Sequence, residues 1–570
     1  MTGRTATGGQ LIVEGLVTHG VDLAFTVAGE SYLEVLDAAV DAPSLRLITC
    51  RQEGGAAFMA EAVGKLSHRP GVAMVTRGPG ACNAAIGVHT AHQDSTPMVL
   101  LVGQVARGMM DREAFQEVDF RKMFAPLAKW VAQIDQAERI PEYLGQAFQV
   151  ATSGRPGPVV LALPEDMLRD RVVVKDRGAY QPVRAHPGAA DLARLRALLA
   201  EAKRPMLLVG GGGWTDEAAA DVQRFALAND IPVCSSFRRQ DVIDNRVAVW
   251  AGDLGTGANP ALVRRLGEAD LVIAVGARLG EITTQSYSAL AIPEPQQRLI
   301  HIHPAAEELG RVMRPVLGIQ AGMPEAAAAL AQLDPVAGSW GAWRAAARAD
   351  YDAQLVPTAT SASLDLGQCM RRLDAHLPDD SIITIDAGNF SGWAQRFLSY
   401  RRPGRQLGPT SGAMGYSVPA GVAAKIRRPG ARVVSFVGDG GFLMTGQELA
   451  TACQEAERTG GGPIILVFDN GMYGTIRMHQ ERRFPGRVSA TRLHNPDFVA
   501  LARSYGAFGA KVEETDQFMD AVRAAEAHGG PAVLHLAVPP EQITTRQTIA
   551  ELQAQSRARL AAGKGFEEHT

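Results

Sequence analysis

The stretch RVVSFVGDGGFLMTGQELATA, residues 432–452, decides the fold of the region around it. Its first part is an apolar run that ends in a glycine-rich turn, and the part after the turn has the spacing of an amphipathic helix starting near Phe442. A second apolar run, PIILVF at 463–468, ends in the polar sequence DNGM. Short apolar runs between glycine turns and helices are typical of buried parallel strands. We therefore predict an α/β region in which two neighbouring strands end in polar residues.

Oxygen donors follow both of these strands. Asp439 offers a carboxylate, Asn470 an amide oxygen and Met472 a backbone carbonyl. Diphosphate oxygens and water would complete the octahedron that Mg²⁺ requires. The alternative is an ordinary strand–turn–helix corner in which Asp439 only caps the helix, but the second donor at Asn470 favours a metal–diphosphate site. The glycines that would let peptide N–H groups approach phosphate are Gly438, Gly440 and Gly441.

The alternation of apolar runs and helical stretches continues over the whole chain, as in GVAMVT at 71–76 and ADLVIAVGA at 269–277. The predicted fold class is α/β, with three consecutive doubly wound domains built on parallel sheets. Stretches of scattered Pro, Gly and polar residues at 172–190 and 333–363 are interpreted as linkers. The predicted domain ranges are 1–175, 188–335 and 362–545, followed by a tail at 546–570 that starts as a helix.

Composition and charge exclude several classes of protein. The 570 residues are 46% hydrophobic and 21% charged, an ordinary globular balance. The net charge of -3 gives no reason to expect nucleic acid or an anionic membrane as a partner. No apolar run approaches the ~20 residues of a membrane span, and the first residues do not resemble a secretory signal. The five cysteines are scattered without metal-site spacing, so we expect reduced thiols in a cytoplasmic protein.

The sequence from Gly438 to Met472 resembles the metal-binding motif of the thiamine-diphosphate enzymes, specifically the acetolactate synthase and 2-oxo acid decarboxylase group. That motif has Gly-Asp-Gly and later Asn-Asn. Here Asp469 replaces the first Asn, and an apparent small insertion around 457–462 lengthens the spacing. The resemblance extends over almost the whole chain. It implies thiamine diphosphate and Mg²⁺ as cofactors, with a pyrimidine-binding domain first, a Rossmann-like domain in the centre and a diphosphate-binding domain last.

The segment RQEGGAAFMAEA at 51–62 is similar to the catalytic-glutamate segment of that family, which implies that Glu53 activates the cofactor. A protonated carboxyl here would hydrogen-bond to the pyrimidine ring and promote loss of the proton from C2 of the thiazolium ring. Alone, Glu-Gly-Gly before a helical stretch is more typical of an ordinary helix start. The downstream motif reverses that preference.

Two more segments of the first domain match the family. TRGPGACN at 76–83 is similar to the turn whose helix faces the cofactor across a subunit interface. AFQE at 114–117 is similar to the synthase segment whose glutamine, here Gln116, faces the substrate. The ordinary alternative for Gln116 is a surface loop.

The third domain contributes four more residues through the resemblance. Gly388 and Asn389 fall in a diphosphate-binding loop. The carbonyl of Gly412 would accept a hydrogen bond from the cofactor's amino group, and the side chain of Met414 would hold the cofactor in its bent form. Core filling is the ordinary alternative for Met414.

Two residues depart from the synthase pattern and bear on the reaction. Glu30 stands where synthases have glycine and decarboxylases have an acid, so it could supply the proton that releases an aldehyde. His479 falls where synthases have the bulky tryptophan that selects the acceptor 2-oxo acid, and it would bring a titratable group to the substrate. A surface position is the alternative for both residues.

The central domain raises the question of FAD. LLVGGGG at 207–213 indicates a strand and a glycine turn, which alone is weak support for dinucleotide binding. Many synthases hold a non-redox FAD on this domain, and Gly276 with Arg278 matches part of their FAD segment. The acidic residues normal for that segment are replaced by Leu279-Gly280 and His301-Ile302-His303. FAD is therefore a possible cofactor rather than an expected one.

The leading hypothesis is a thiamine-diphosphate enzyme that cleaves and ligates carbon–carbon bonds of a 2-oxo acid or 1,2-dicarbonyl, like an acetolactate synthase. A non-ligating 2-oxo acid decarboxylase stays open, since Glu30 and His479 favour it. A non-catalytic nucleotide-binding protein with the same fold is disfavoured because Glu53, Asp439 and Asn470 are all present. An NAD oxidoreductase is disfavoured because its fingerprint is missing. The resemblance further implies a small carbonyl compound as substrate and a homodimer or homotetramer with active sites at subunit interfaces.

Overall fold

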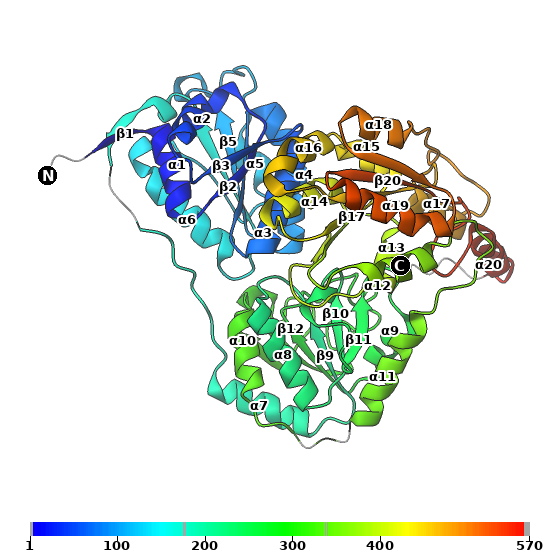
Figure 1. The fold of residues 1–570 in the computed structure, drawn as a ribbon. Helices are drawn as coiled ribbons and strands as arrows, with labels where there is room; N and C mark the ends of the chain where they lie inside the picture. Colours follow the sequence, from blue (N-terminus) through cyan, green and yellow to red (C-terminus); the bar gives the residue numbers. More distant parts are fainter. Residues whose placement is uncertain (1–3, 175–177, 337, 339, 564–570) are drawn as a thin grey trace. The chain divides into compact units, whose positions relative to one another are not determined.

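The computed structural model describes residues 4–174, 178–336, 338 and 340–563. Its internal contacts divide the chain into two compact units. The first consists of Met1–Val183, Pro409–Pro429 and Thr445–Glu455, and the second of Arg184–Gly408, Gly430–Met444 and Ala456–Thr570. The described residues form three six-stranded sheets, all parallel, and one two-stranded pair (Figure 1). The predicted fold class, three α/β domains with parallel sheets, is confirmed.

The first sheet lies in the first unit and is flanked by helices. Its strands, in spatial order, are β3 (Arg46–Thr49), β2 (Leu23–Thr26), β4 (Gly71–Val75), β5 (Met98–Gln104), β7 (Pro158–Pro164) and β6 (Trp130–Gln133). The helices between them are α1 (Gly8–Thr18), α2 (Leu33–Val40), α3 (Glu53–Ser67), α4 (Gly78–Asp94), α5 (Phe120–Phe124) and α6 (Ile140–Thr152). A short antiparallel pair joins β1 (Thr5–Thr7) to β8 (Arg171–Val173). The later helix α14 (Ser417–Arg427) packs against α3 in the same unit.

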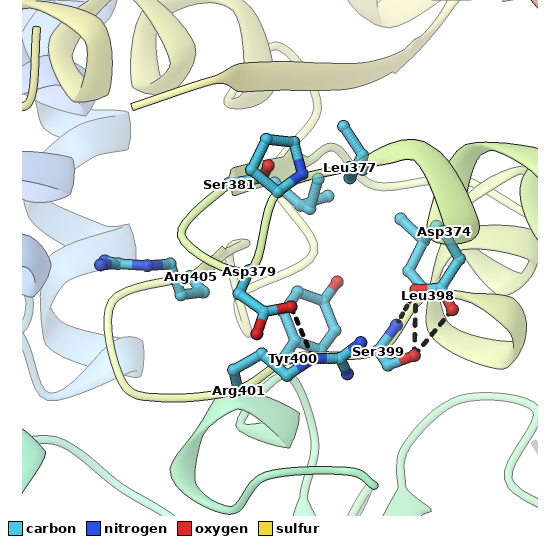
Figure 2. Close-up of a pocket in the computed structure, with 11 residues that line it drawn as sticks. Asp374, Leu377, Asp379, Ser381, Leu398, Ser399, Tyr400, Arg401 and Arg405 are labelled. Atoms are coloured by element: carbon cyan, nitrogen blue, oxygen red, sulfur yellow. Dashed lines mark hydrogen bonds and ion pairs between the residues drawn. The ribbon is translucent and has the colours of Figure 1, made fainter. Parts of the chain in front are cut away.

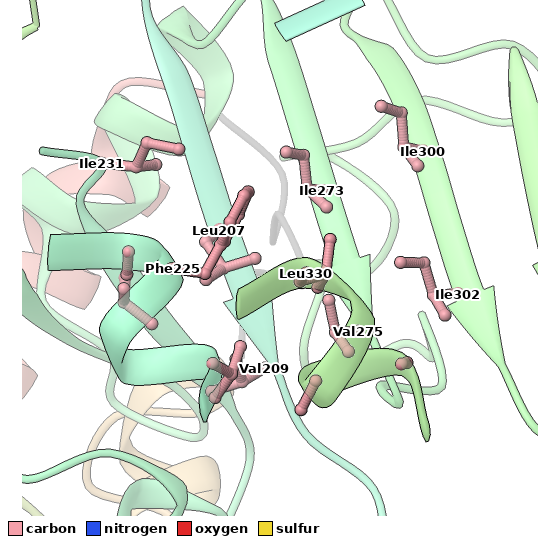
Figure 3. Close-up of a cluster of buried hydrophobic side chains, with 14 of the residues drawn as sticks. Leu207, Val209, Phe225, Ile231, Ile273, Val275, Ile300, Ile302 and Leu330 are labelled. Atoms are coloured by element: carbon pink, nitrogen blue, oxygen red, sulfur yellow. The ribbon is translucent and has the colours of Figure 1, made fainter. Parts of the chain in front are cut away.

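The central sheet lies in the second unit. Its strands, in spatial order, are β11 (Trp250–Leu254), β10 (Val233–Ser236), β9 (Pro205–Val209), β12 (Leu271–Val275), β13 (Arg298–His303) and β14 (Leu317–Gln320). Its helices are α7 (Ala189–Ala200), α8 (Asp216–Ala228), α9 (Pro260–Glu268), α10 (Met323–Ala331) and α11 (Gly341–Gln354). Figure 3 shows one face of this sheet, where Leu207, Ile273 and Ile300 pack beneath Phe225 of α8 and Leu330 of α10. Burial of these aliphatic side chains is the main stabilising term for such a layer.

The third sheet completes the second unit. Its strands, in spatial order, are β16 (Gln406–Leu407), β15 (Ile382–Ile385), β17 (Val433–Gly438), β18 (Ile464–Asp469), β20 (Ala532–Ala537) and β19 (Phe508–Val512). The helices along this part of the chain are α12 (Leu366–His376), α13 (Ser391–Phe397), α15 (Asp439–Thr445), α16 (Glu448–Thr459), α17 (Gly474–Arg483), α18 (Phe498–Ser504), α19 (Thr515–His528) and α20 (Ile549–Ala561).

The helix after the glycine turn starts earlier than the sequence suggested. α15 begins at Asp439, directly after β17, and not near Phe442. The Asp439 carboxylate accepts the N–H of Gly440 over 2.9 Å, which stabilises a helix start that two poor helix formers, Gly440 and Gly441, would otherwise weaken.

In each six-stranded sheet the strand order reverses between two inner strands. The chain runs outward to one side from β2, β9 and β15, and then returns to the other side of the same strand with β4, β12 and β17, respectively. Loops leave such a strand pair in opposite directions, and α/β proteins commonly bind ligands in the crevice at these carboxyl ends. Three of the regions singled out from the sequence lie at or after the ends of these strands. They are Glu30 with 76–83, the glycines 210–213 with Gly276, and Asp386–Asn389 with Gly438–Gly441.

Two further sequence expectations can be compared with the structure. All five cysteines are free thiols. Among the described residues, no helix combines the length and the apolar character needed to cross a lipid bilayer.

Candidate active site

Polar side chains from four segments meet at the carboxyl ends of β17 and β18. The strand register puts Gly438 opposite Phe468, so Asp439 and Asp469 follow at adjacent strand ends. The Asn495 amide donates to both carboxylates, over 2.8 Å to Asp439 Oδ2 and 2.8 Å to Asp469 Oδ1. His535 Nε2 lies 2.8 Å from the second oxygen of Asp469. Asp439 is therefore held at the edge of the sheet where Asn470 follows Asp469.

The charges at this edge suit a divalent cation. Burial raises the pKa of Asp439 to about 6, and the Asp469 carboxylate adds to the shift. Burial also acts on Asp469, but hydrogen bonds from His535 and Asn495 hold its pKa below the ordinary value. A cation beside Asp439 would favour the ionised carboxylate. In the described part of the chain, no three His, Cys, Asp or Glu side chains are grouped so that they could hold a metal ion by themselves.

The three glycines of the turn allow side chains to pack closely. A Cβ on Gly438 would lie 2.9 Å from the Phe390 ring, and one on Gly440 would lie 2.6 Å from the Tyr473 ring. A Cβ on Gly441 would lie 3.2 Å from the carboxylate of Asp386. We expected these glycines to admit phosphate, and the structure adds a second reason for them.

The loop after β15 is held from two sides. Arg238, a buried residue of the central domain, donates over 2.9 Å to the carbonyl of Asp386. Thr475 of α17 accepts the N–H of Asn389 over 3.0 Å and is 3.0 Å from its side-chain oxygen. Gly388 has a φ of 156°, so this loop is close to extended at the glycine. The predicted loop residues Gly388 and Asn389 therefore lie at the strand pair of the predicted metal ligand.

The turn after β18 leads into the helix that carries His479. Asn470 Oδ1 accepts the N–H of Met472 over 3.3 Å, and Met472 forms an isolated antiparallel bridge with Arg492. His479 lies on α17 with its side chain open to solvent. The protein atoms around its ring still remove part of the ring's hydration, and this loss and the charge of Arg482 lower its pKa.

Glu53 is the first residue of α3 and lies in the first unit. Its Oε2 accepts the side-chain N–H of Asn83 over 2.9 Å. Asn83 belongs to α4, whose first turn contains Gly80, and a Cβ on Gly80 would lie 3.6 Å from Glu53 Oε1. The structure therefore brings together the two segments that the sequence selected separately, 51–62 and 76–83.

The segment with Gly412 and Met414 is fixed on the same unit at both ends. Before it, the N–H of Thr410 donates to Asp94 over 2.6 Å. After it, the Tyr416 hydroxyl donates to buried Glu61 over 2.6 Å. Gly412 has a φ of 69°, which favours glycine, and Met414 is half-buried.

Glu30 lies at the strand-order reversal of the first sheet. Its carboxylate pairs with Arg77 over 3.1 Å, and Arg77 also pairs with Glu165, which follows β7. The Glu30 side chain is 62% exposed, whereas that of Arg77 is 8% exposed. The buried guanidinium of Arg77 thus holds the largely exposed carboxylate of Glu30 where the strands of this sheet end.

Gln116 docks onto the start of α4. Its carbonyl accepts the N–H of Gly78 over 3.0 Å, and its φ of 66° is unusual for a residue other than glycine. Its side-chain Oε1 is buried without a hydrogen-bond partner among the described residues. A buried acceptor without a partner is expected to be satisfied by water or a ligand.

Where the strand order of the central sheet reverses, the glycines pack closely against neighbouring atoms. A Cβ on Gly276 would overlap the carbonyl of Gly210 and the sulfur of Met323. Trp214 follows the glycine turn and donates over 2.8 Å to the carbonyl of Gly210, before α8 starts at Asp216. A dinucleotide fingerprint needs a helix that starts at the glycines. The glycines here fit backbone packing and give FAD no support beyond the resemblance.

A polar pocket in the second unit lies away from the predicted site residues. Ser381, which lines this pocket, comes just before β15, whereas Asp386 follows the other end of that strand. Figure 2 shows Asp374 bonded to Ser399 and Asp379 to Arg401 in its wall. The pocket is therefore at the amino edge of the third sheet, opposite the edge that carries Asp439.

Several residues of the site were not found from the sequence. Asn495, His535 and Arg238 lie far along the chain from the residues they contact. The one local signal was the sequence NPD at 495–497, which indicates a turn before a helix, and Asp497 indeed caps α18.

Comparison with known proteins agrees with the three-domain fold. Residues 6–123, 192–330 and 386–536 match the N-terminal, central and C-terminal domains of the thiamine pyrophosphate enzymes. The chain is 30% identical to the probable acetolactate synthase large subunit of Methanocaldococcus jannaschii, over 94% of this chain and 92% of that protein. It is also 30% identical to the acetolactate synthase isozyme 2 large subunit of Escherichia coli, over 93% and 95%, respectively. The chain belongs to the thiamine pyrophosphate enzyme family, among the relatives of acetolactate synthase large subunits.

Proposed function

We propose that this thiamine-diphosphate-dependent enzyme acts on 2-oxo acids and joins the resulting two-carbon or longer fragment to a second carbonyl compound. The observation that carries the proposal is the edge of the third sheet, where Asn495 holds Asp439 beside the strand end of Asn470. The named acetolactate synthases support ligation as the main reaction.

Mg²⁺ would be held by Asp439, Asn470 and the carbonyl of Met472. The diphosphate would lie against Gly388, Asn389 and the N–H groups of the glycine turn, whose residues are Gly438, Gly440 and Gly441. When bound, thiamine diphosphate supplies an electron sink for the carbon next to the carbonyl. Glu53 would hold a proton at the pyrimidine ring, in a position set by Asn83.

Three residues would act on the substrate side. Gln116 offers a buried acceptor that has no partner among the described residues. Glu30 would move a proton to or from the product carbon, and Arg77 would stabilise its carboxylate. His479 would transfer a proton to or from the acceptor substrate. The presence of Glu30 and His479 also favours the second candidate function, decarboxylation without ligation.

The active protein would be a homodimer or homotetramer in which Glu53 of one subunit completes the site of another. Gly412 and Met414 would contact the cofactor in such a composite site. FAD is left out of this proposal, because close packing accounts for Gly210, Gly211 and Gly276 without a nucleotide.

Product analysis tests the proposal. The protein is incubated with pyruvate, and separately with longer 2-oxo acids, in the presence of thiamine diphosphate and Mg²⁺. We expect an acetolactate-type product from pyruvate that disappears when the cofactor is omitted. Free aldehyde alone would favour the decarboxylase, and no cofactor-dependent product from any 2-oxo acid would contradict both functions.

A further inference from the structure

Glu448, the first residue of α16, is a completely buried carboxylate with no part in the proposed reaction. It is 0% exposed. Its Oε1 accepts the backbone N–H groups of Arg51 and Gln52, each over 3.0 Å. Its Oε2 accepts the hydroxyl of Thr451 over 2.7 Å. Because Arg51 and Gln52 immediately precede Glu53, one oxygen of Glu448 holds the backbone that leads into α3.

The start of α3 is shaped to admit this carboxylate. Gly55 lies in the first turn, and a Cβ there would be 2.6 Å from Glu448 Oε1. Gln52 caps the same turn by accepting the N–H of Gly55 over 2.9 Å. The Arg51 side chain extends along α16 and donates to Gln454 over 2.9 Å. The entry to α3 is therefore fixed by backbone, cap and side-chain contacts at once.

A carboxylate is well suited to this task. A carboxylate oxygen that accepts two N–H groups in a buried place makes charge-assisted bonds, which are stronger than neutral ones. Burial raises the pKa of the Glu448 carboxyl, while its bonds to Thr451, Arg51 and Gln52 oppose that shift. The geometry of the two N–H bonds, which depends on the length of the side chain, fixes the peptide groups in space.

We propose that Glu448 is a positioning residue for Glu53. It fixes the peptide groups of Arg51 and Gln52, and thereby the direction in which the Glu53 carboxyl leaves the first turn of α3. The inference rests on the proposed role of Glu53 as the acid that activates the cofactor. Only Gly446 and Gln447 separate Glu448 from α15, so the residue that orients the acid belongs to the same stretch of chain as the proposed metal ligand Asp439.

The test compares three variants of the full-length protein with bound thiamine diphosphate and Mg²⁺. Glu448→Asp shortens the side chain by one methylene and so moves the acceptor oxygen away from the N–H groups of Arg51 and Gln52. Gly55→Ala places a methyl group on α3 that pushes the Glu448 carboxylate aside. Glu448→Gln keeps an acceptor oxygen at the original distance. The matched control is Glu455→Gln, a buried acid on the same helix that pairs with Arg46 at the start of β3.

The measured quantity is the rate of hydrogen–deuterium exchange at C2 of the bound cofactor. We expect Glu448→Asp and Gly55→Ala to slow it on the order of 10- to 100-fold, because a small misplacement of a reacting group has effects of this size. Glu448→Gln should retain most of the rate, and Glu455→Gln should exchange like the unaltered protein. The affinity for thiamine diphosphate and the midpoint of thermal unfolding, measured in parallel, should change little in the two slow variants.

Three results would overturn the inference or its basis. Unaltered exchange in both Glu448→Asp and Gly55→Ala, with slow exchange in Glu53→Gln, would show that Glu448 does not position Glu53. Loss of cofactor affinity or folding in step with the loss of exchange would make Glu448 a purely structural residue. Unaltered exchange in Glu53→Gln would instead remove the proposed role of Glu53 itself.

Discussion

The third and central sheets both carry glycines where the strand order reverses, but the residues beside those glycines differ. In the third sheet Asp386 follows β15 and Asp439 follows β17. The side-chain amide of Asn495 donates to the carboxylates of both Asp439 and Asp469. In the central sheet the strands β9 and β12 are followed by Gly210 and Gly276, and a Cβ on Gly276 would overlap the Gly210 carbonyl and the sulfur of Met323. The reversal of strand order determines where a ligand can bind, and the residues after the strands determine whether one does.

The first sheet is the instructive third case. It has the same strand order as the third sheet, with β2 and β4 in the places of β15 and β17. Its strand ends carry an ion pair, Glu30 with Arg77, instead of a metal ligand. We propose that the same arrangement of strands binds the metal ion in one domain and transfers protons in another.

The largest expected effect is at the third sheet. Asp439→Ala removes the only carboxylate proposed to bind Mg²⁺, so thiamine diphosphate affinity and activity should fall together, by more than roughly 100-fold. Cofactor binding is measured by calorimetric titration with Mg²⁺ present. Asn495→Ala is the matched variant, because it removes only the residue that holds Asp439, and it should cost roughly 10- to 100-fold. Unchanged cofactor affinity in Asp439→Ala would break the comparison between the sheets.

The edge of the first sheet should affect the fate of the product carbon. Glu30→Gln should leave cofactor binding unchanged and slow release of product on the order of 10²-fold, as expected when a general acid or base is lost. Acid-quenched intermediates, identified by NMR, should shift toward the adduct formed after cleavage. Glu14→Gln, an exposed acid paired with Arg4, is the control and should behave as the unaltered protein. If Glu30→Gln gives the unaltered distribution, Glu30 is only the surface partner of Arg77.

The central sheet should respond in stability and not in chemistry. Gly276 has a φ of 76°, and a Cβ would meet the Gly210 carbonyl and Met323. Gly276→Ala should therefore cost more than ~1 kcal/mol, which lowers the midpoint of thermal unfolding by at least roughly 2–4 °C. The matched control is Gly267→Ala in α9, where a Cβ would meet nothing within 4 Å. A Gly276→Ala protein that folds normally but loses a bound nucleotide would show that the central sheet binds a ligand.

The smallest expected effect is a pH dependence from His479. Its pKa lies below the ordinary 6.5, so the imidazole is neutral at pH 7 and becomes charged only in more acidic solution. If His479 accepts a proton from the acceptor substrate, the ligation rate should fall as the pH drops below about 6.5. His479→Gln should lower the rate at pH 7 and remove that acidic limb. An identical pH profile in both proteins would assign His479 to the surface.

The sequence was sufficient for what depends on local pattern. Apolar runs predicted the strands, and the glycine turns selected from the sequence lie at reversals of strand order that only the structure shows. Contacts between distant segments had no local signal, because nothing in HNPDF around Asn495 indicates that its amide joins two carboxylates. Glu448 lies in a predicted helix, and no local pattern indicates that it bonds to residues 51 and 52. The start of α15 was placed too late, because glycine propensity outweighed the stabilisation of the helix end by Asp439 in that reading.

The central claim is that the edge of the third sheet and Glu53 serve one cofactor. Co-expression of two inactive chains, Glu53→Gln and Asp439→Ala, tests it most directly. In a mixed dimer one site combines both changes and the other combines neither, so the account predicts that activity returns in the purified mixed protein. A mixed dimer as inactive as either parent would contradict the account.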